Sequence, residues 1–133
     1  MTSYKIYGEH NKPTPSAIGA AQSMASTYPG KGRYGQSNPT TLTFDFAPKL
    51  VFINATFARG SSQCYAWGHF TANGKVAFYN ERRSDGIDEF VPLNVTWSED
   101  GRTLSWYAES DGPGAAMAQF DWSGVTYNYV AIG

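Results

Sequence analysis

The sequence predicts an all-β protein, an antiparallel β-sandwich of six to eight strands that follows an extended N-terminal arm. Three observations favour this class. Phe, Trp and Tyr make up 16% of the 133 residues, 14 Gly and 7 Pro supply turn formers, and apolar residues recur with a period of two from residue 40 onward. Aromatic residues favour strands, and a period of two is typical of a half-buried strand.

Residues 1–33 are expected to form the arm and residues 34–133 the sandwich domain. Three prolines interrupt regular structure in the first segment, although Ser16–Ala25 is compatible with a short helix capped by Ser16. The first segment is net basic and the rest is net acidic. The arm could therefore lie on an acidic body in the same subunit or in a neighbouring one.

The first half of the domain contains four predicted strands. Thr41–Phe46 alternates apolar and polar residues, which is typical of a half-buried strand. Leu50–Phe57 is apolar on both faces, as expected of a central strand covered on each side. Gln63–Phe70 and Val76–Tyr79 flank Asn73-Gly74, the strongest short hairpin signal, so these two strands are expected to pair.

Four more strands are expected in the second half. Val91–Trp97 alternates, and Pro92 cannot donate a hydrogen bond, so this strand is predicted to lie at an edge or to start there. A turn leads into Thr103–Glu109. The apolar run Ala115–Phe120 and the alternating segment Val125–Ile132 complete a set of about eight strands.

Composition argues against several classes of function. The net charge of −1 is not that of a nucleic-acid-binding protein, and the apolar runs are too short to span a membrane. No signal peptide is apparent at the N-terminus. A single cysteine, Cys64, excludes a disulfide framework and a multi-cysteine zinc site. No cofactor and no metal are expected.

The sequence also gives little sign of an enzyme. Cys64 and His69 are five residues apart, and side chains at odd separations on a strand point to opposite faces, so they cannot form a catalytic pair. Cys64 is expected to be a small buried residue. Acidic residues followed by glycine, such as Asp85 and Asp100, are expected to form turns.

The aromatic residues of Gln63–Phe70 form the most informative pattern. Tyr65, Trp67 and His69 share the face opposite Cys64, and Tyr79 on the next strand could extend the row. Such a row can stack on pyranose rings, fill a subunit interface or belong to a second core, and these alternatives remain open. On the last strand, one face is formed by Thr126, Asn128, Val130 and Ile132, and the apolar end of this face predicts burial against the arm or a neighbouring chain.

Two polar segments flank this row. Arg82 and Arg83 are placed in a long loop, Asn80–Phe90, where guanidinium groups can bind carboxylates or acidic sugars, or stay solvated beside acidic neighbours. Arg59–Gln63 is expected to be a polar loop suited to sugar hydroxyls or simply a connection. The candidate glycan-binding residues are Arg59, Ser61, Gln63, Tyr65, Trp67, His69, Arg82 and Arg83.

Three segments resemble known proteins, one in the arm and two in the domain. Tyr7–Ala21, with its H-N-K-P-T-P and I-G-A-A segments, resembles short segments in bacteriophage and prophage tail fibres. The segments Gly35–Ile53 and Ser123–Gly133 resemble the distal domain that closes such fibres, and they are also similar to H-type lectins. The resemblance covers both ends of the chain, whereas residues 58–122 match poorly.

The resemblance implies a function. It indicates an H-type-lectin-like homotrimer that binds a bacterial surface glycan at the tip of a tail fibre in the virion, or in a prophage-encoded fibre, without catalysis. The arm would contact other tail proteins. Two alternatives are a purely structural domain that trimerises and caps the fibre, and a free-standing carbohydrate-binding lectin. A glycan depolymerase, which would need paired carboxylates, is a more remote reading.

Overall fold

The computed structural model describes residues 22–109 and 113–133. The strands in these residues form one eight-stranded antiparallel sheet in the order β1-β8-β3-β4-β5-β6-β7-β2. The elements are β1 Ser23–Pro29, β2 Thr40–Thr43, β3 Leu50–Arg59, β4 Ser62–Thr71, β5 Val76–Arg83, β6 Asp88–Trp97, β7 Thr103–Ala108, α1 Pro113–Ala118 and β8 Thr126–Ile132. The all-β prediction is confirmed.

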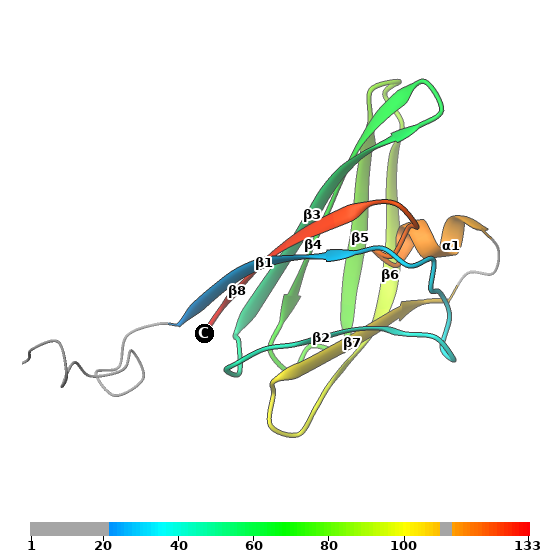
Figure 1. The fold of residues 1–133 in the computed structure, drawn as a ribbon. Coiled ribbons are helices and arrows are strands. Elements are labelled where there is room, and N and C mark those ends of the chain that lie inside the picture. The colour runs from blue at the N-terminus through cyan, green and yellow to red at the C-terminus, as the bar shows by residue number, and fades with distance from the viewer. Residues whose placement is uncertain (1–21, 110–112) are drawn as a thin grey trace, which may run out of the picture.

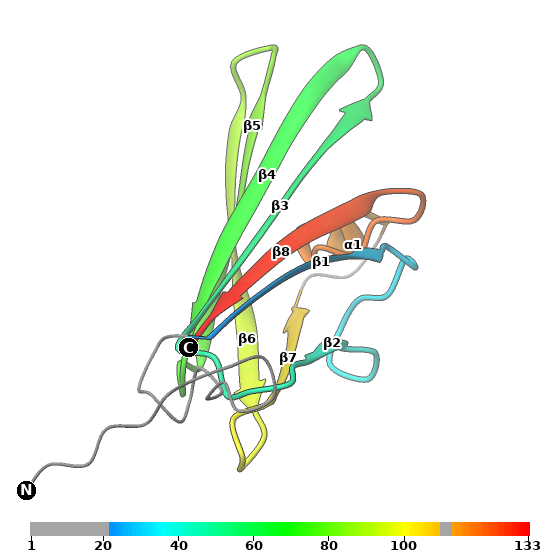
Figure 2. The same ribbon diagram turned by 60° about the vertical axis from the view of Figure 1, so that its left-hand side comes forward.

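The sheet curls around its own inner face, as Figures 1 and 2 show. The hairpins β3–β4 and β5–β6 are built from the longest strands and project beyond the rest of the molecule. The inner face of the curled sheet encloses the core, as the two layers of a sandwich would. The prediction that β3 is covered on both sides is therefore wrong within this chain: its outer residues Phe52 and Asn54 stay partly exposed, and Thr56 is exposed.

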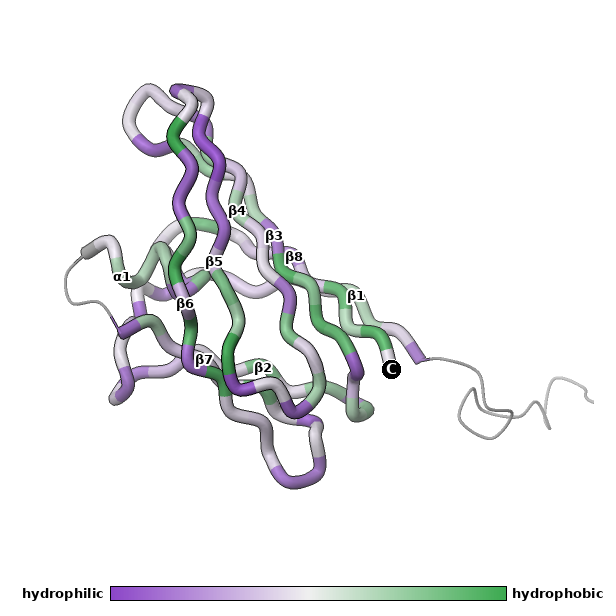
Figure 3. Tube along the Cα trace, turned by 180° about the vertical axis from the view of Figure 1, so that it is seen from behind, coloured by the Kyte–Doolittle hydropathy of each residue, from purple (hydrophilic) through white to green (hydrophobic). Residues whose placement is uncertain are grey.

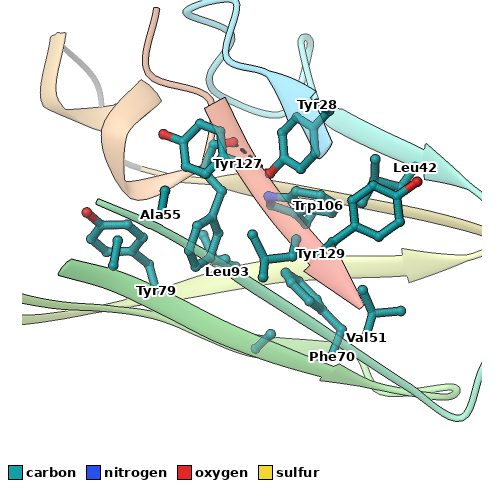
Figure 4. Close-up of a cluster of buried hydrophobic side chains, with 14 of the residues drawn as sticks. Tyr28, Leu42, Val51, Ala55, Phe70, Tyr79, Leu93, Trp106, Tyr127 and Tyr129 are labelled. Atoms are coloured by element: carbon teal, nitrogen blue, oxygen red, sulfur yellow. Dashed lines mark hydrogen bonds between the residues drawn. The ribbon is translucent and has the colours of Figure 1, made fainter. Parts of the chain in front are cut away.

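Aromatic side chains from opposite parts of the sheet meet in the core (Figure 4). Trp106 of β7 is fully buried, with its ring centroid 4.8 Å from that of Phe70 and 6.4 Å from that of Tyr28. Its indole Nε1 donates to the carbonyl of Gln119 at 2.7 Å. Edge-to-face and tilted pairs of this kind add to the stabilisation from burial alone.

The predicted strand Ala115–Phe120 is wrong, because this run begins in helix α1, Pro113–Ala118. A short apolar run does not distinguish a strand from a buried helix, but small alanines and a proline at the first helical position favour the helix. After the helix, Phe120 adopts a positive φ of 55°, and the Asp121 amide donates to the Ala116 carbonyl at 2.9 Å. This is the usual left-handed reversal at a helix C-terminus, here made by a non-glycine residue.

Part of the predicted arm belongs to the sheet. β1 is an edge strand that pairs with β8 along its whole length, from Ser23 opposite Ile132 to Pro29 opposite Thr126. The expected boundary at residue 33 therefore does not coincide with the limit of the sheet. The predicted helix is wrong for residues 23–25, which are strand, while residues 16–21 lie outside the described residues.

Two buried polar side chains after α1 hold the segment that links β1 to β2. The Asp121 carboxylate accepts hydrogen bonds from the Lys31 amide (2.6 Å), Arg33 Nε (2.7 Å) and the Thr40 hydroxyl (2.5 Å). Gln119 donates through Nε2 to the Thr40 hydroxyl at 3.1 Å. Arg33 of the N-terminal segment thus forms an ion pair with Asp121 of the body within one chain.

Two segments that are expected to be loops, Arg59–Gln63 and Asn80–Phe90, consist mainly of strand and contain only short turns. β3 ends at Arg59 and β4 begins at Ser62, so a two-residue turn replaces the expected loop. β5 ends at Arg83 and β6 begins at Asp88, which places both Arg82 and Arg83 on a strand.

Pro92 lies within β6, and β6 is not an edge strand. The edge prediction is therefore wrong, for a local reason. β6 pairs with β5 over Asp88–Asn94 but with β7 only from Leu93 onward. The Val95 amide donates toward β5, to the Lys75 carbonyl at 3.0 Å, and amides alternate in direction along a strand. The Pro92 nitrogen therefore faces the β7 side, where no ladder is present.

Candidate functional site

The outer face of the sheet carries an exposed apolar surface. Eight large hydrophobic side chains are exposed in the described residues, and six of them lie on this face. We call these six the outer apolar patch: Tyr65, Val76, Phe78, Phe90, Val130 and Ile132. Figure 3 shows hydrophobic chain along the lower parts of β5 and β6 and hydrophilic chain toward the tip of their hairpin.

The strand register brings the patch and its neighbours side by side. Phe52 of β3 lies opposite Val130 of β8 on one side and opposite His69 of β4 on the other. Phe78 of β5 lies opposite Pro92 of β6. Facing side chains on antiparallel strands are about 4.5–5.5 Å apart at Cβ, so these rows form a surface that extends from β8 to β6.

Tyr65 and Trp67 form a stacked pair on this face. Their ring centroids are 5.3 Å apart and their planes meet at 22°. Arg82 lies opposite Tyr65, and Asn80 lies opposite Trp67 and donates through Nδ2 to the Trp67 carbonyl at 3.1 Å. The register therefore places a flat aromatic pair beside one guanidinium and one amide.

The candidate glycan-binding residues do not form one cluster. The outer face carries Gln63, Tyr65, Trp67, His69 and Arg82, the inner face carries Arg59 and Arg83, and Ser61 lies in the β3–β4 turn. The Arg82 side chain is 72% exposed, and its Nε lies 3.1 Å from Oδ1 of Asp88. Hydrogen bonding to this carboxylate raises the pKa of Arg82.

Arg59 and Arg83 are held by carboxylates on the inner face between the hairpins. The buried Glu81 carboxylate accepts from Arg83 Nε at 2.5 Å, from Arg59 at 3.2 Å and from the Tyr79 hydroxyl at 2.7 Å. Arg83 also pairs with Glu89. Burial and the hydrogen bond to Glu81 raise the pKa of Tyr79 well above its ordinary value. Both guanidinium groups are thus engaged within the fold and do not point toward the outer aromatic pair.

Cys64 and His69 lie on opposite faces of β4, as the sequence predicts. Cys64 is buried on the inner face and His69 is exposed on the outer one. Burial is the main cause of a raised pKa of the Cys64 thiol, and the nearby Glu81 carboxylate adds to it. A raised pKa disfavours the thiolate, the nucleophilic form. Among residues 22–109 and 113–133, no three His, Cys, Asp or Glu side chains are grouped so that they could hold a metal ion.

Sequence reasoning missed the members of the outer apolar patch on β5 and β6, which are Val76, Phe78 and Phe90. Tyr79, expected to extend the aromatic row, is buried in the core, and Phe78 takes that place on the outer face. The alternation of β5 contains this information, because Val76 and Phe78 lie on one face of the strand and Ala77 and Tyr79 lie on the other. Both faces of this strand are apolar, so alternation alone did not show which one is buried.

Comparison with known proteins gives no relative for this chain. No family model matches it, and no curated protein or solved structure is significantly similar. In the part of the chain that the structure describes, no helix has the length and apolar character needed to cross a membrane.

Proposed function

We propose that the chain is a non-catalytic adhesion domain that acts as a homotrimer, of the kind that ends a bacteriophage or prophage tail fibre, and that its copies pack through the outer apolar patch. The observation that carries the proposal is the patch itself. The patch exposes apolar surface that the fold does not need to expose, and this surface lies on one face of the sheet.

The size of the patch supports an interface. Tyr65, Phe78 and Phe90 are 43%, 51% and 69% exposed. A fully exposed aromatic side chain presents about 150–250 Å², so these three leave about 250–400 Å² open to solvent. The largest patch on a typical monomer is roughly 300–600 Å², and the aliphatic members still have to be added.

Burial of these rings is large enough to matter for association. At about 25 cal/mol per Å², covering the three rings would contribute about 6–10 kcal/mol per chain. This is of the same order as the roughly 4–15 kcal/mol that association costs in lost freedom of motion. The contribution of Val76, Val130 and Ile132 then favours the assembled state.

The chemistry of the patch favours a second copy over a sugar as its occupant. Its members are aromatic and aliphatic, and only one of the six, Tyr65, has a polar atom in the side chain. Sugar sites combine apolar rings with convergent polar groups, whereas the core of a homo-oligomeric interface is depleted of charge. In a cyclic trimer each copy contributes two different surfaces to its two neighbours, and a patch that extends from β8 to β6 can supply both when it faces the threefold axis.

The adhesive part of the proposal is supported by the resemblance of both ends of the chain to tail-fibre segments. A trimer presents three equivalent sites toward a bacterial surface glycan, and linked weak sites gain overall affinity by factors of about 10²–10⁴. In the alternative, purely structural role, the domain only trimerises and caps the fibre, and it should bind no glycan on an array.

The mass of the full chain in solution, measured by light scattering, tests the oligomer. We expect about three chains for the wild type and a monomer for the double variant Phe78→Ser and Phe90→Ser. The matched control is Ile87→Ser, because Ile87 is 46% exposed but lies in the β5–β6 turn outside the patch. A monomeric wild type, or a double variant that stays trimeric, overturns the proposed interface.

A further inference from the structure

We infer that the chain carries a binding site for a neutral saccharide on the outer face of β6 and β7, centred on Asn94, Tyr107 and Glu109. This inference rests on the adhesive part of the proposed function. It places the ligand beside the outer apolar patch, away from the Tyr65–Trp67 pair that the sequence favours.

Three hollows in the surface meet at these residues. One of about 520 Å³ contains Asn94 and Tyr107, a second of about 660 Å³ contains Tyr107 and Glu109, and a third of about 320 Å³ contains Asn94 and Glu109. Each of the three residues therefore lines two hollows. Ligand pockets in proteins range over about 300–1,000 Å³, so each hollow has room for a sugar unit.

The strand register and a hydrogen bond fix the relative positions of the three side chains. Asn94 of β6 lies directly opposite Tyr107 of β7. Glu109 follows two residues after Tyr107, and Asn94 Nδ2 donates to Glu109 Oε1 at 2.9 Å. The amide and the carboxylate thus hold each other beside the tyrosine ring before any ligand arrives.

This arrangement has the groups that a pyranose needs. The half-buried Tyr107 ring offers a flat apolar surface for the C–H face of a sugar. Glu109 is exposed, and a carboxylate that accepts from Asn94 through Oε1 can accept from a sugar hydroxyl through Oε2. Asn94 Oδ1 can accept from a second one.

The surrounding residues indicate a neutral ligand. Gln36 and Ser37 line the second hollow, and Thr96 lines the first, which adds amide and hydroxyl groups without charge. The charged lining residues are one cation, Lys75, and one anion, Glu109. An acidic sugar would meet the Glu109 carboxylate, and like charges at this distance oppose binding.

The site is compatible with the proposed trimer. No member of the outer apolar patch lines the first or the second hollow. The first contains Asn73–Lys75, and the second contains Tyr34–Ser37. Only the third hollow does, through Val76. Two of the three hollows therefore stay outside the patch when copies pack on it, and the third borders the interface.

Saturation-transfer NMR and calorimetry on the full chain test the inference. The neutral probes are methyl β-galactopyranoside, methyl α-glucopyranoside, methyl α-mannopyranoside and N-acetylgalactosamine, and the acidic probe is sialyllactose. We expect weak binding of at least one neutral probe and none of sialyllactose. Tyr107→Ala and Glu109→Gln should each weaken binding by about tenfold, because each removes one principal contact. Tyr107→Phe should retain most of the affinity.

Arg82→Ala is the matched control, since Arg82 belongs to the rival location beside Tyr65 and its exposed ion pair contributes little to stability. Binding that survives Tyr107→Ala but is lost in Arg82→Ala overturns the inference in favour of that location. Binding of the acidic probe alone, or of no probe, also overturns it. The mass is recorded on the same samples, so a trimer that binds no sugar refutes this site and leaves the proposed interface standing.

Discussion

Replacement of Asp121 by alanine would remove the acceptor that ties the N-terminal segment to the body. The Asp121 side chain is fully buried. It accepts from the Lys31 amide at 2.6 Å, from Arg33 Nε at 2.7 Å and from the Thr40 hydroxyl at 2.5 Å. The three donors lie between the end of β1 and the start of β2, so one carboxylate determines the path of this connection.

The three contacts contribute unequally to the expected loss. Arg33 is 31% exposed and can be rehydrated, so its ion pair is worth about 0–1 kcal/mol. The Lys31 and Thr40 contacts are hydrogen bonds to a charged group, at about 1.5–3 kcal/mol each. Thr40 is buried and would lose its acceptor. We expect Asp121→Ala to lower the free energy of unfolding by about 3–5 kcal/mol. Asp121→Asn, which keeps the volume, should cost about half of that.

Thermal unfolding followed by circular dichroism measures the effect. For a chain of this length, about 1 kcal/mol corresponds to roughly 3–5 °C, so Asp121→Ala should lower Tm by about 10–20 °C. Asp45→Ala is the control, because Asp45 is exposed, and its Tm should change by less than about 2 °C. A fall below about 4 °C for Asp121→Ala would refute the reasoning.

Three further predictions concern other parts of the fold. Gly30→Ala should destabilise by more than about 3 kcal/mol in denaturant titration, since its Cβ would lie 1.9 Å from the Trp122 carbonyl oxygen, whereas Gly114→Ala meets nothing within 4 Å and should be neutral or stabilising. Cys64 should react with a thiol reagent only as fast as the protein opens, and labelling faster than unfolding would contradict its burial. Stability should fall as the pH rises above about 10. Burial raises the pKa of three tyrosines and so favours their neutral form, and these should titrate at 295 nm only together with unfolding: Tyr28, Tyr79 and Tyr127.

The sequence was sufficient for the strands whose two faces differ in polarity. β4 is the clearest case, because Cys64 and Phe70 are buried on one face while Tyr65 and His69 are exposed on the other, as alternation predicts. Turn chemistry was equally informative at Asp100, whose side chain accepts from Ser98 and from the Arg102 amide and whose pKa is lowered by these bonds.

The sequence failed where tertiary contacts replace local pattern. The hairpin tips are polar on both faces because Glu81 holds Arg59 and Arg83 on the inner side, and a segment that is polar on both faces has the composition of a loop. β1 has few apolar residues and is recruited into the sheet by pairing with β8. Neither the contacts of Glu81 with the two arginines nor the pairing of β1 with β8 produces a recognisable pattern within a single segment of the sequence.

The Asn94–Tyr107–Glu109 site was not predictable for a related reason. Asn94 and Glu109 are 15 residues apart, and only the β6–β7 register places one beside the other. Taken alone, Asn94 and Tyr107 are ordinary outward-facing positions on strands, and Glu109 is the residue that follows β7. The site is thus a property of the pairing of two strands, which composition and period do not specify.

The aromatic content of the chain supports a functional outer face. A protein with one curled sheet needs aromatic side chains on its inner face, and Phe70, Tyr79, Trp106 and Tyr127 are used in this way. The core gives no role to Phe90, which is 69% exposed. Large exposed apolar patches mark interaction sites in proteins, which is consistent with the proposed association. If the proposed assembly forms, conversion of the outer face to serine and threonine should leave the fold intact and abolish that assembly, whereas the same change on the inner face should prevent folding.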